Sequence, residues 1–577
     1  MPSNRALAVL AMAIIFATIC FRLGHLPLLA PDEGRNAEVS REMEESGAWL
    51  VPTYDGVDYL DKPAFYFKAV SFSLAIFGQN ETAARLPSAA FGVGLVAMVL
   101  AFCRKVHSTR CGLLAAIIVP TMPLYFANAR TVIFDIALAF FVCGAIFAGY
   151  LAETTEGKPR RIWYLLGAAS AGLATLVKGP IGFLIPVLVL LFFNRLEGRT
   201  GSWKRLFAPL NLAVFFGITL PWFIGLCLAH RDFFHYGVVE ESFHRFTIAS
   251  RFHRSEPVYF YLFIVAGLFF PWSLLLPEAS LATWKERWAK HPADRLCVLW
   301  SVVVIIFFSL SQSKLPGYIL TVTVACGILL ARLLEAALTA PEGRAARVLV
   351  RATSIFAVMC LLASMVAALG VSHAPLLAKP LRISVVAAKQ LGQSALPLAL
   401  LLAGFSLVAT VARYRRSPAL CILCLTVFPP LLIHLNTGVL NTVFDAKSGR
   451  EIASQLSGLP GRTELACFEC FPNGLSFYLG RTATVISRDG RELTSNYIIS
   501  ALEKKQWPKQ IVPLSDFDDW LTSRKEPVCL ILRRTDLARV ETLAASRLTA
   551  VRALSPDFLV AHLSAPEGAP HYVRHLR

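Results

Sequence analysis

Two acidic residues and an arginine lie together just beyond the first apolar segment of the chain. Positions 30 to 38 read Ala-Pro-Asp-Glu-Gly-Arg-Asn-Ala-Glu, which places Asp32, Glu33 and Arg35 within one short stretch. Further along, Tyr59 and Lys62 add a phenol and a second cation. A carboxylate can orient or deprotonate a reacting group, and cations can bind a phosphate. The cluster therefore indicates either chemistry on an anionic ligand or a solvated polar loop.

The composition predicts that membrane helices position these residues. The chain has 577 residues, of which 55% are hydrophobic and 16% charged, too apolar for a soluble globule of this size. About 20 apolar residues are needed to cross a bilayer as a helix. Thirteen segments approach or reach that length: 6–23, 86–103, 111–127, 131–152, 162–177, 180–193, 206–229, 258–277, 296–310, 318–331, 348–371, 394–412 and 419–435. We expect a polytopic α-helical membrane protein with about thirteen transmembrane helices.

The distribution of Lys and Arg predicts the orientation of these helices. The net charge is +18, and Lys and Arg collect in cytoplasmic loops of membrane proteins. Six basic clusters fall on one side of the thirteen segments, at 104–110, 158–161, 195–205, 285–295, 332–351 and 413–416. The positive charge is therefore explained by orientation, and we expect no nucleic-acid partner. The loops 24–85, 230–257, 311–317 and 372–393, and the chain beyond about 436, are expected on the outer side.

The hydropathy falls after about residue 440, which predicts two domains. Residues 1–438 form the expected transmembrane domain, and residues 439–577 form an expected α/β domain outside the membrane. In the latter, strand patterns at 464–468, 482–487, 528–532 and 558–562 alternate with helical patterns at 447–456, 493–505 and 537–546. The loop after the first segment is expected to hold two interfacial helices, at 33–46 and 64–77. One disulfide among Cys467, Cys470 and Cys529 is a further option.

Other charged residues stand at the outer ends of apolar segments. Asp135 opens the fourth segment, with Arg130 five residues earlier, while Lys178 and Lys314 lie at outer junctions. Ionisable groups at such places usually line cavities. The alternatives are a structural pair of Asp135 with Arg130 and, for each lysine, an anchor that reaches the interface.

The outward cations together suit a lipid phosphate or pyrophosphate. They are Arg35, Lys62, Lys178, Arg245, Arg254 and Lys314. A divalent metal is a further option, with Asp61, Glu241 and His244 as ligands, because carboxylate and imidazole suit such ions. A solvated charge network is the favoured alternative there, since the tight spacing of a metal motif is absent.

Six motifs in order resemble one protein family. They read PDEGRNAEVSREM, VPTYDGVDYLDKPAFYF, RTVIFDIAL, LVKGPIGFLIP, EESFHRF and SKLPGYIL. Together they resemble the bacterial aminoarabinose (4-amino-4-deoxy-L-arabinose) lipid A transferases. These belong to a wider group of polytopic, lipid-sugar-dependent glycosyltransferases that includes protein O-mannosyltransferases. The chain has Asp61 and Gly34 where the family pattern implies a glutamate and a threonine.

The resemblance implies a reaction and roles for the candidate residues. A sugar would move from undecaprenyl phosphate to a phosphate of lipid A at the periplasmic face of the bacterial inner membrane, with inversion and without a required cofactor. Such a change to lipopolysaccharide would confer polymyxin resistance. Asp32, with Asp135 and Glu33, would orient the acceptor or stabilise charge on the sugar. The donor phosphate would be bound by Arg35, Tyr59, Lys62, Lys178, Arg245, Arg254, Lys314 and Tyr318.

Two other functions fit parts of the pattern. A polyprenyl-phosphate-sugar transferase could act on protein or on another glycan through the same donor site. A lipid-linked sugar flippase would need charges distributed through the depth of the membrane. Here the charged residues gather at the outer ends of segments, which favours an enzyme.

Overall fold

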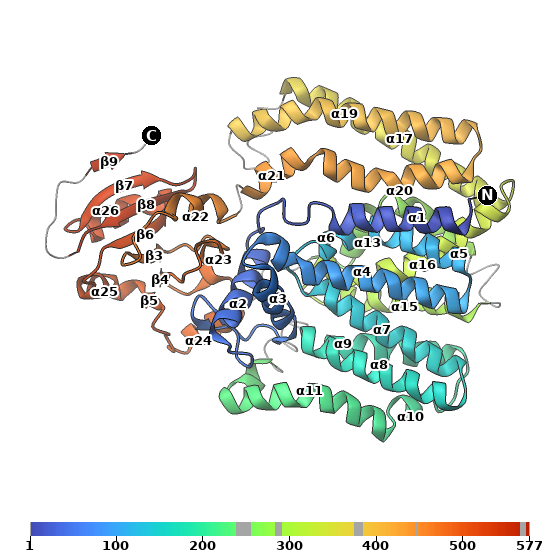
Figure 1. Ribbon diagram of the computed structural model, residues 1–577, viewed down its shortest axis with the longest axis horizontal. Helices are drawn as coiled ribbons and strands as arrows, with labels where there is room; N and C mark the ends of the chain where they lie inside the picture. The colour runs from blue at the N-terminus through green and yellow to red at the C-terminus, as the bar shows by residue number, and fades with distance from the viewer. Residues whose placement is uncertain are drawn as a thin grey trace. The chain divides into compact units, whose positions relative to one another are not determined.

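The computed structural model describes residues 2–237, 256–282, 291–373, 385–445, 448–565 and 573–575. The chain divides into two compact units. The helical unit comprises residues 1–23 and 85–440, and the mixed unit comprises residues 24–84 and 441–577. Figure 1 shows the elements of each. The first long loop therefore belongs to the same unit as the C-terminal segment.

All thirteen apolar segments expected from the sequence are helical. Several helices of the helical unit begin or end with short 3-10 or π turns, and the first residues of α4 and the last of α21 extend into the mixed unit. The helices are α1 (Asn4–Ile15), α4 (Glu81–Val106), α5 (Thr109–Ile118), α6 (Pro123–Ala129), α7 (Asp135–Thr154), α8 (Gly157–Lys178), α9 (Ile181–Leu196), α10 (Ser202–Leu206), α11 (Pro209–Ala229), α13 (Phe260–Leu268), α14 (Leu276–Ala282), α15 (Pro292–Leu310), α16 (Leu320–Thr339), α17 (Arg344–His373), α19 (Val385–Tyr414), α20 (Pro418–Leu435) and α21 (Thr437–Asp445). Helix α7 packs against α8, and α17 packs along α19 (Figure 1).

Length and composition identify the helices that can cross a membrane. Among the described residues, eight helices pass on their own, and two bent pairs raise the number to ten. The pairs bend by 74° after residue 121 and by 109° after residue 268. At the first bend, Met122 is extended because the ring of Pro123 disfavours a helical conformation in the residue before it. The other three expected segments correspond to α1 with its π turn, α8 and α9.

The first loop folds into two helices joined by a short hairpin. Helix α2 (Asp32–Ser46) ends at Gly47, whose φ of +65° suits glycine, and α3 (Phe65–Phe77) follows the strands β1 (Thr53–Tyr54) and β2 (Val57–Asp58). The two expected helices of this loop are thus present.

Gly34 lets α2 approach another segment of the mixed unit closely. A Cβ atom at position 34 would lie 2.6 Å from the backbone nitrogen of Gly474. Any side chain there would force one backbone to move. The departure from the family pattern at position 34 therefore accompanies a close contact between two backbones in this chain.

The C-terminal segment contains a seven-stranded mixed sheet. Its order is β5-β4-β3-β6-β8-β7-β9, in which β3 to β6 pair in parallel and β8 is antiparallel to both β6 and β7. The strands are β3 (Glu464–Phe468), β4 (Thr484–Ser487), β5 (Ile511–Pro513), β6 (Val528–Arg533), β7 (Leu548–Ala553), β8 (Phe558–Leu563) and β9 (Val573–His575). The helices are α22 (Arg450–Leu456), α23 (Leu475–Leu479), α24 (Asn496–Glu503), α25 (Phe517–Ser523) and α26 (Leu537–Leu543).

The core of this sheet domain is apolar and closed. Phe468 and Leu530, on adjacent central strands, are buried together with Phe517 of α25 and Val540 of α26. The expected α/β character is confirmed, and four of the strands lie where the sequence predicts them. All thirteen cysteines are free, including the three in this domain, so the optional disulfide does not form.

Candidate active site

Asp32 and Arg35 form an ion pair on the first turns of α2. The distance from Arg35 Nη2 to Asp32 Oδ1 is 2.5 Å. The Asp32 side chain is 49% exposed, whereas the Arg35 side chain is 10% exposed. A carboxylate at a helix N-terminus is favoured by the helix dipole. The pair therefore leaves the carboxylate of Asp32 accessible to a ligand while the buried Arg35 fixes its orientation.

Arg35 also forms hydrogen bonds with Thr494 of the C-terminal segment. Its Nη1 donates to the carbonyl oxygen and to the Oγ1 of Thr494, both at 2.8 Å. Its guanidinium also lies 5.8 Å from the ring centre of the buried Tyr59. With these contacts, the geometry favours a supporting role for Arg35 over the predicted direct grip on a phosphate.

Asp61 and Lys62 follow Tyr59 in the same loop. The Asp61 carboxylate accepts hydrogen bonds from the backbone N–H groups of Asn496 at 3.2 Å and Tyr497 at 2.8 Å. Both oxygens thus accept from the first turn of α24, and the predicted role of Asp61 as a metal ligand stays a prediction. A helix N-terminus carries free N–H donors that a carboxylate satisfies. The Lys62 ammonium donates to the Asp61 carbonyl at 2.7 Å.

Glu33 lies beside Asp32 but faces the protein interior. Its side chain is buried, and Oε2 accepts a hydrogen bond from the backbone N–H of Leu29 at 3.0 Å. It thereby ties down the turn that leads into α2. This position favours a structural role over the predicted catalytic one.

A second group of predicted residues meets within the helical unit. Asp135 at the start of α7 pairs with Lys178 at the end of α8, with 2.5 Å between Oδ1 and Nζ. The Lys178 ammonium also lies 5.1 Å from the ring centre of Tyr318. Gly317 passes so close that a Cβ there would lie 3.1 Å from the Asp135 carboxyl carbon. Acid, cation and phenol from three distant segments thus form one cluster, and their predicted roles in binding and catalysis stay predictions.

Arg130 and Lys314 donate to backbone carbonyl oxygens. Arg130 donates to carbonyl oxygens of residues 18, 19, 21 and 22, so the alternative pairing of Arg130 with Asp135 does not occur. Lys314 is buried and donates to the carbonyls of Ser311 and Glu256, at 2.5 and 2.8 Å. These bonds hold a loop, and they make Lys314 a weaker candidate for phosphate binding.

Four predicted residues lie outside the described ranges. They are the metal candidates Glu241 and His244 and the phosphate candidates Arg245 and Arg254. Their predicted roles stay predictions.

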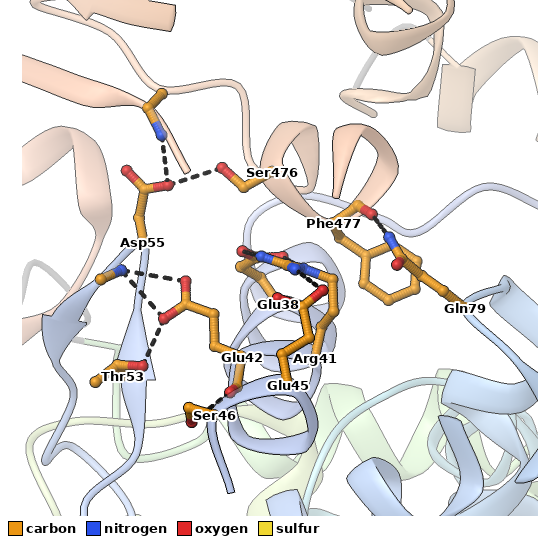
Figure 2. A network of polar contacts seen from close by, with 12 residues as sticks. Glu38, Arg41, Glu42, Glu45, Ser46, Thr53, Asp55, Gln79, Ser476 and Phe477 are labelled. Carbon is orange, nitrogen blue, oxygen red and sulfur yellow. Dashed lines mark hydrogen bonds and ion pairs between the residues drawn. The ribbon is translucent and has the colours of Figure 1, made fainter. Parts of the chain in front are cut away.

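A buried carboxylate network formed by α2 and the hairpin that follows it was not predicted. Figure 2 shows Glu38, Glu42 and Asp55, whose nearest carboxylate oxygens lie within 4.8 Å of one another. Arg41 binds Glu38 through two hydrogen bonds of 2.6 and 2.8 Å. Glu38, Arg41 and Glu42 fall at helical spacing in the sequence, which is the one signal that could have indicated a shared face.

Protein donors satisfy much of this network. Glu42 accepts from Thr53 Oγ1 at 2.5 Å and from the Gly56 N–H at 3.1 Å. Asp55 accepts from Ser476 Oγ at 2.8 Å and from the Ala483 N–H at 3.0 Å (Figure 2). The network thus ties the hairpin of the first loop to the C-terminal segment, which favours a structural role.

The buried acids make stability depend on pH. Burial raises the pKa of Asp55 to about 7, and burial raises that of Glu38 to about 8 although Arg41 opposes it. In the unfolded chain both lie near 4. The folded state therefore binds more protons between about pH 4 and 8, and stability present below pH 4 is lost as the pH rises through 7 to 8.

We expect the melting temperature of the full-length protein in detergent to fall between pH 5.5 and 8.5. Asp55→Asn should flatten this dependence, because the amide oxygen still accepts from Ser476 and Ala483 but carries no charge. The stability gained at pH 8.5 should be on the order of 2 kcal/mol. Thermal unfolding of both proteins across this range measures the effect. An identical slope in the variant would contradict it.

The chain is similar to proteins of known name over most of its length. The chain is 28% identical over 522 residues to the undecaprenyl phosphate-alpha-4-amino-4-deoxy-L-arabinose arabinosyl transferase of Erwinia tasmaniensis, with 88% of this chain and 90% of the relative covered. It is 27% identical over 539 residues to the protein of that name from Yersinia enterocolitica, with 91% and 92% covered. Residues 6–236 match the family described as dolichyl-phosphate-mannose-protein mannosyltransferase.

A solved structure covers almost the whole chain. The crystal structure of ArnT from Cupriavidus metallidurans bound to undecaprenyl phosphate superposes with a TM-score of 0.80 at 25% identity, covering 98% of both chains. These similarities confirm the resemblance drawn from the sequence. They also confirm a polytopic helical fold with a C-terminal sheet domain and the class of membrane glycosyltransferase.

Proposed function

We propose that this membrane glycosyltransferase moves 4-amino-4-deoxy-L-arabinose from undecaprenyl phosphate to a phosphate of lipid A. The observation that carries the proposal is the similarity, over 98% of both chains, to an ArnT structure bound to undecaprenyl phosphate. The named relatives, at 28% and 27% identity over most of their length, support the same donor. The lipid A acceptor and a periplasmic location of the site are the finer parts of the proposal.

The reaction exchanges one glycosyl phosphate bond for another. An oxygen of the acceptor phosphate attacks the anomeric carbon, the bond from that carbon to the oxygen of undecaprenyl phosphate breaks, and its electron pair leaves with the lipid phosphate. A phosphate acceptor is already ionised near neutral pH, so no strong base is needed. Direct displacement inverts the anomeric centre. The demand on the protein is electrostatic stabilisation at both ends of the transfer.

The two residue groups can meet these demands. Asp32 offers an exposed carboxylate fixed by Arg35, suited to an oxocarbenium-like sugar or to its amine. In the mixed unit, Lys62 offers a cation for a phosphate. In the helical unit, Lys178 and Tyr318 offer a cation and a hydroxyl, with Asp135 orienting Lys178. Arg245 and Arg254 are further phosphate candidates.

One assay tests the proposal directly. Purified protein is incubated with undecaprenyl-phosphate aminoarabinose and lipid A, and the products are weighed by mass spectrometry. We expect lipid A to gain one aminoarabinose residue. If lipid A stays unmodified and the donor is consumed when a protein or glycan acceptor replaces lipid A in a parallel reaction, the lipid A acceptor is overturned while the enzyme class stands. Movement of intact donor across proteoliposomes without a product would favour a flippase.

We further propose that transfer requires no cofactor or divalent metal. The leaving group is a phosphate monoester that protein cations can stabilise, and the acceptor needs no metal to ionise it. We expect the transfer rate to change less than twofold when the purified enzyme is assayed in excess EDTA. A loss of activity that Mg²⁺ or Mn²⁺ restores would contradict this and would return Glu241 and His244 to consideration as ligands.

A further inference from the structure

Three residues of the C-terminal segment, Thr494, Asn496 and Tyr497, contact two separate parts of the first loop. Thr494 binds Arg35 near the start of α2, and the backbone of Asn496 and Tyr497 binds Asp61. The two candidate reactive residues of this loop each bind one of these contacted residues: Asp32 binds Arg35, and Lys62 binds the carbonyl of Asp61. We call residues 494–497 the positioning corner.

Thr494 adopts a conformation that its side chain disfavours. Its φ of +55° and ψ of +27° lie in the left-handed region, which a β-branched residue rarely occupies. In this conformation its carbonyl and Oγ1 oxygens both accept from Arg35 Nη1 at 2.8 Å. Strained residues persist where the surrounding contacts determine them, and they concentrate at functional sites.

Arg35 transmits this contact to Asp32. While Nη1 of Arg35 donates to Thr494, its Nη2 donates to Asp32 Oδ1 at 2.5 Å. Because the guanidinium is planar and rigid, fixing Nη1 also fixes Nη2. The direction of the exposed Asp32 carboxylate therefore depends on Thr494.

The first turn of α24 holds the other side of the loop. Ser495 caps this helix by accepting from the Ile498 N–H at 3.3 Å, and the neighbouring N–H groups bind the Asp61 carboxylate at 2.8 and 3.2 Å. The Lys62 ammonium rests on the Asp61 carbonyl. The helix thus fixes the backbone from which Lys62 extends.

We propose that the positioning corner sets the geometry of Asp32 and Lys62 for the transfer step, so that the C-terminal domain takes part in catalysis through Arg35 and Asp61. Thr494 is in this sense a positioning residue, since it acts through Arg35 rather than on the substrate. The inference rests on the proposed function. If residues 494–497 only anchor the first loop, substitutions there should lower stability and activity in parallel.

Three variants at position 494 separate these roles. Thr494→Val keeps the shape and the carbonyl but removes Oγ1, Thr494→Ser keeps the hydroxyl, and Thr494→Gly removes the hydroxyl and relieves the strained φ. We expect Thr494→Val to lower kcat about 10-fold with KM for the donor within twofold, and Thr494→Ser to retain most activity. Thr494→Gly should melt at or above the temperature of the wild type and still lose kcat.

A double variant tests the route through Asp32. If Thr494 acts by orienting Asp32, adding Thr494→Val to Asp32→Asn should lower the residual rate less than twofold. A full 10-fold further loss would overturn this route, and wild-type kcat in Thr494→Val would overturn the proposal. So would a Thr494→Gly protein that loses stability and activity in parallel.

An assay without sugar transfer separates this inference from the proposed function. Amide hydrogen exchange over residues 29–36 should speed up in Thr494→Val and not in Thr494→Ser, whatever the acceptor is. If wild-type protein fails to modify lipid A while exchange responds as expected, the proposed function fails and the structural coupling stands. If the wild type is active but exchange over residues 29–36 is the same in Thr494→Val as in the wild type, the coupling between Thr494 and α2 is excluded.

Discussion

Asp32→Asn is expected to lower kcat for aminoarabinose transfer by roughly 100-fold or more, in the range seen when one preorganised electrostatic group is removed from an active site. The amide keeps an oxygen that accepts from Arg35 but carries no charge for the developing positive charge on the sugar. Because the Asp32 side chain is 49% exposed, its ion pair contributes little to stability, on the order of 0–1 kcal/mol. Donor binding should also stay within about twofold. Steady-state rates by product mass, together with melting temperatures, measure these effects.

A neighbouring acid provides the control. Glu44 is exposed on the same helix, and Glu44→Gln removes one negative charge without entering the candidate site. We expect wild-type kcat from Glu44→Gln, so a general effect of charge on the loop can be separated from the role of Asp32. Full activity in purified Asp32→Asn protein would exclude Asp32 from the mechanism.

Local patterns predicted the membrane helices and the two helices of the first loop. Apolar length and helical spacing are properties of neighbouring residues, so they can be read from a single sequence. The same holds for Asp32 and Arg35, which are three residues apart and meet on one helix. The strands β5, β7 and β9 were missed, because β5 and β9 have only three residues each and β7 lacks regular alternation of buried and exposed residues.

Contacts between distant segments could not be predicted in the same way. Arg35 and Thr494 are 459 residues apart, and half of their contact uses a backbone carbonyl, which leaves no trace in the residue type. Asp61 could be recognised as a carboxylate near the site, but its partner is the N-terminus of a helix 435 residues later. Its side chain alone is equally compatible with a metal ligand. Residue types near the candidate site can therefore be read from the sequence, whereas their partners in distant segments cannot.

Loss of Lys178 is expected to impair both folding and transfer. Its ion pair with Asp135 joins side chains that are only 14% and 11% exposed, so Lys178→Met leaves a buried carboxylate without its cation. Breaking such a pair from one side costs about 3 kcal/mol. We also expect kcat to fall by about 100-fold, since a cation for the departing phosphate is lost. Melting temperature and single-turnover rates measure the two effects separately.

A matched pair elsewhere in the helical unit shows what a purely structural loss does. Arg295 binds Glu197 at the same distance of 2.5 Å, with exposures of 13% and 10%. We expect Arg295→Met to lower the melting temperature by a similar amount, with kcat of the folded protein unchanged. The comparison holds burial and distance constant, so a difference in kcat reports chemistry.

The double variant Asp135→Asn with Lys178→Met decides between the two readings of the pair. Removing both charges leaves no uncompensated carboxylate, so we expect stability to recover most of what the single variant loses. If the cation serves the departing phosphate, activity stays low despite this recovery. Recovery of transfer together with stability would assign the pair to the structure alone. In that case the acid and cation that contribute to transfer would have to be sought in the first loop, where Asp32 and Lys62 are held by the positioning corner.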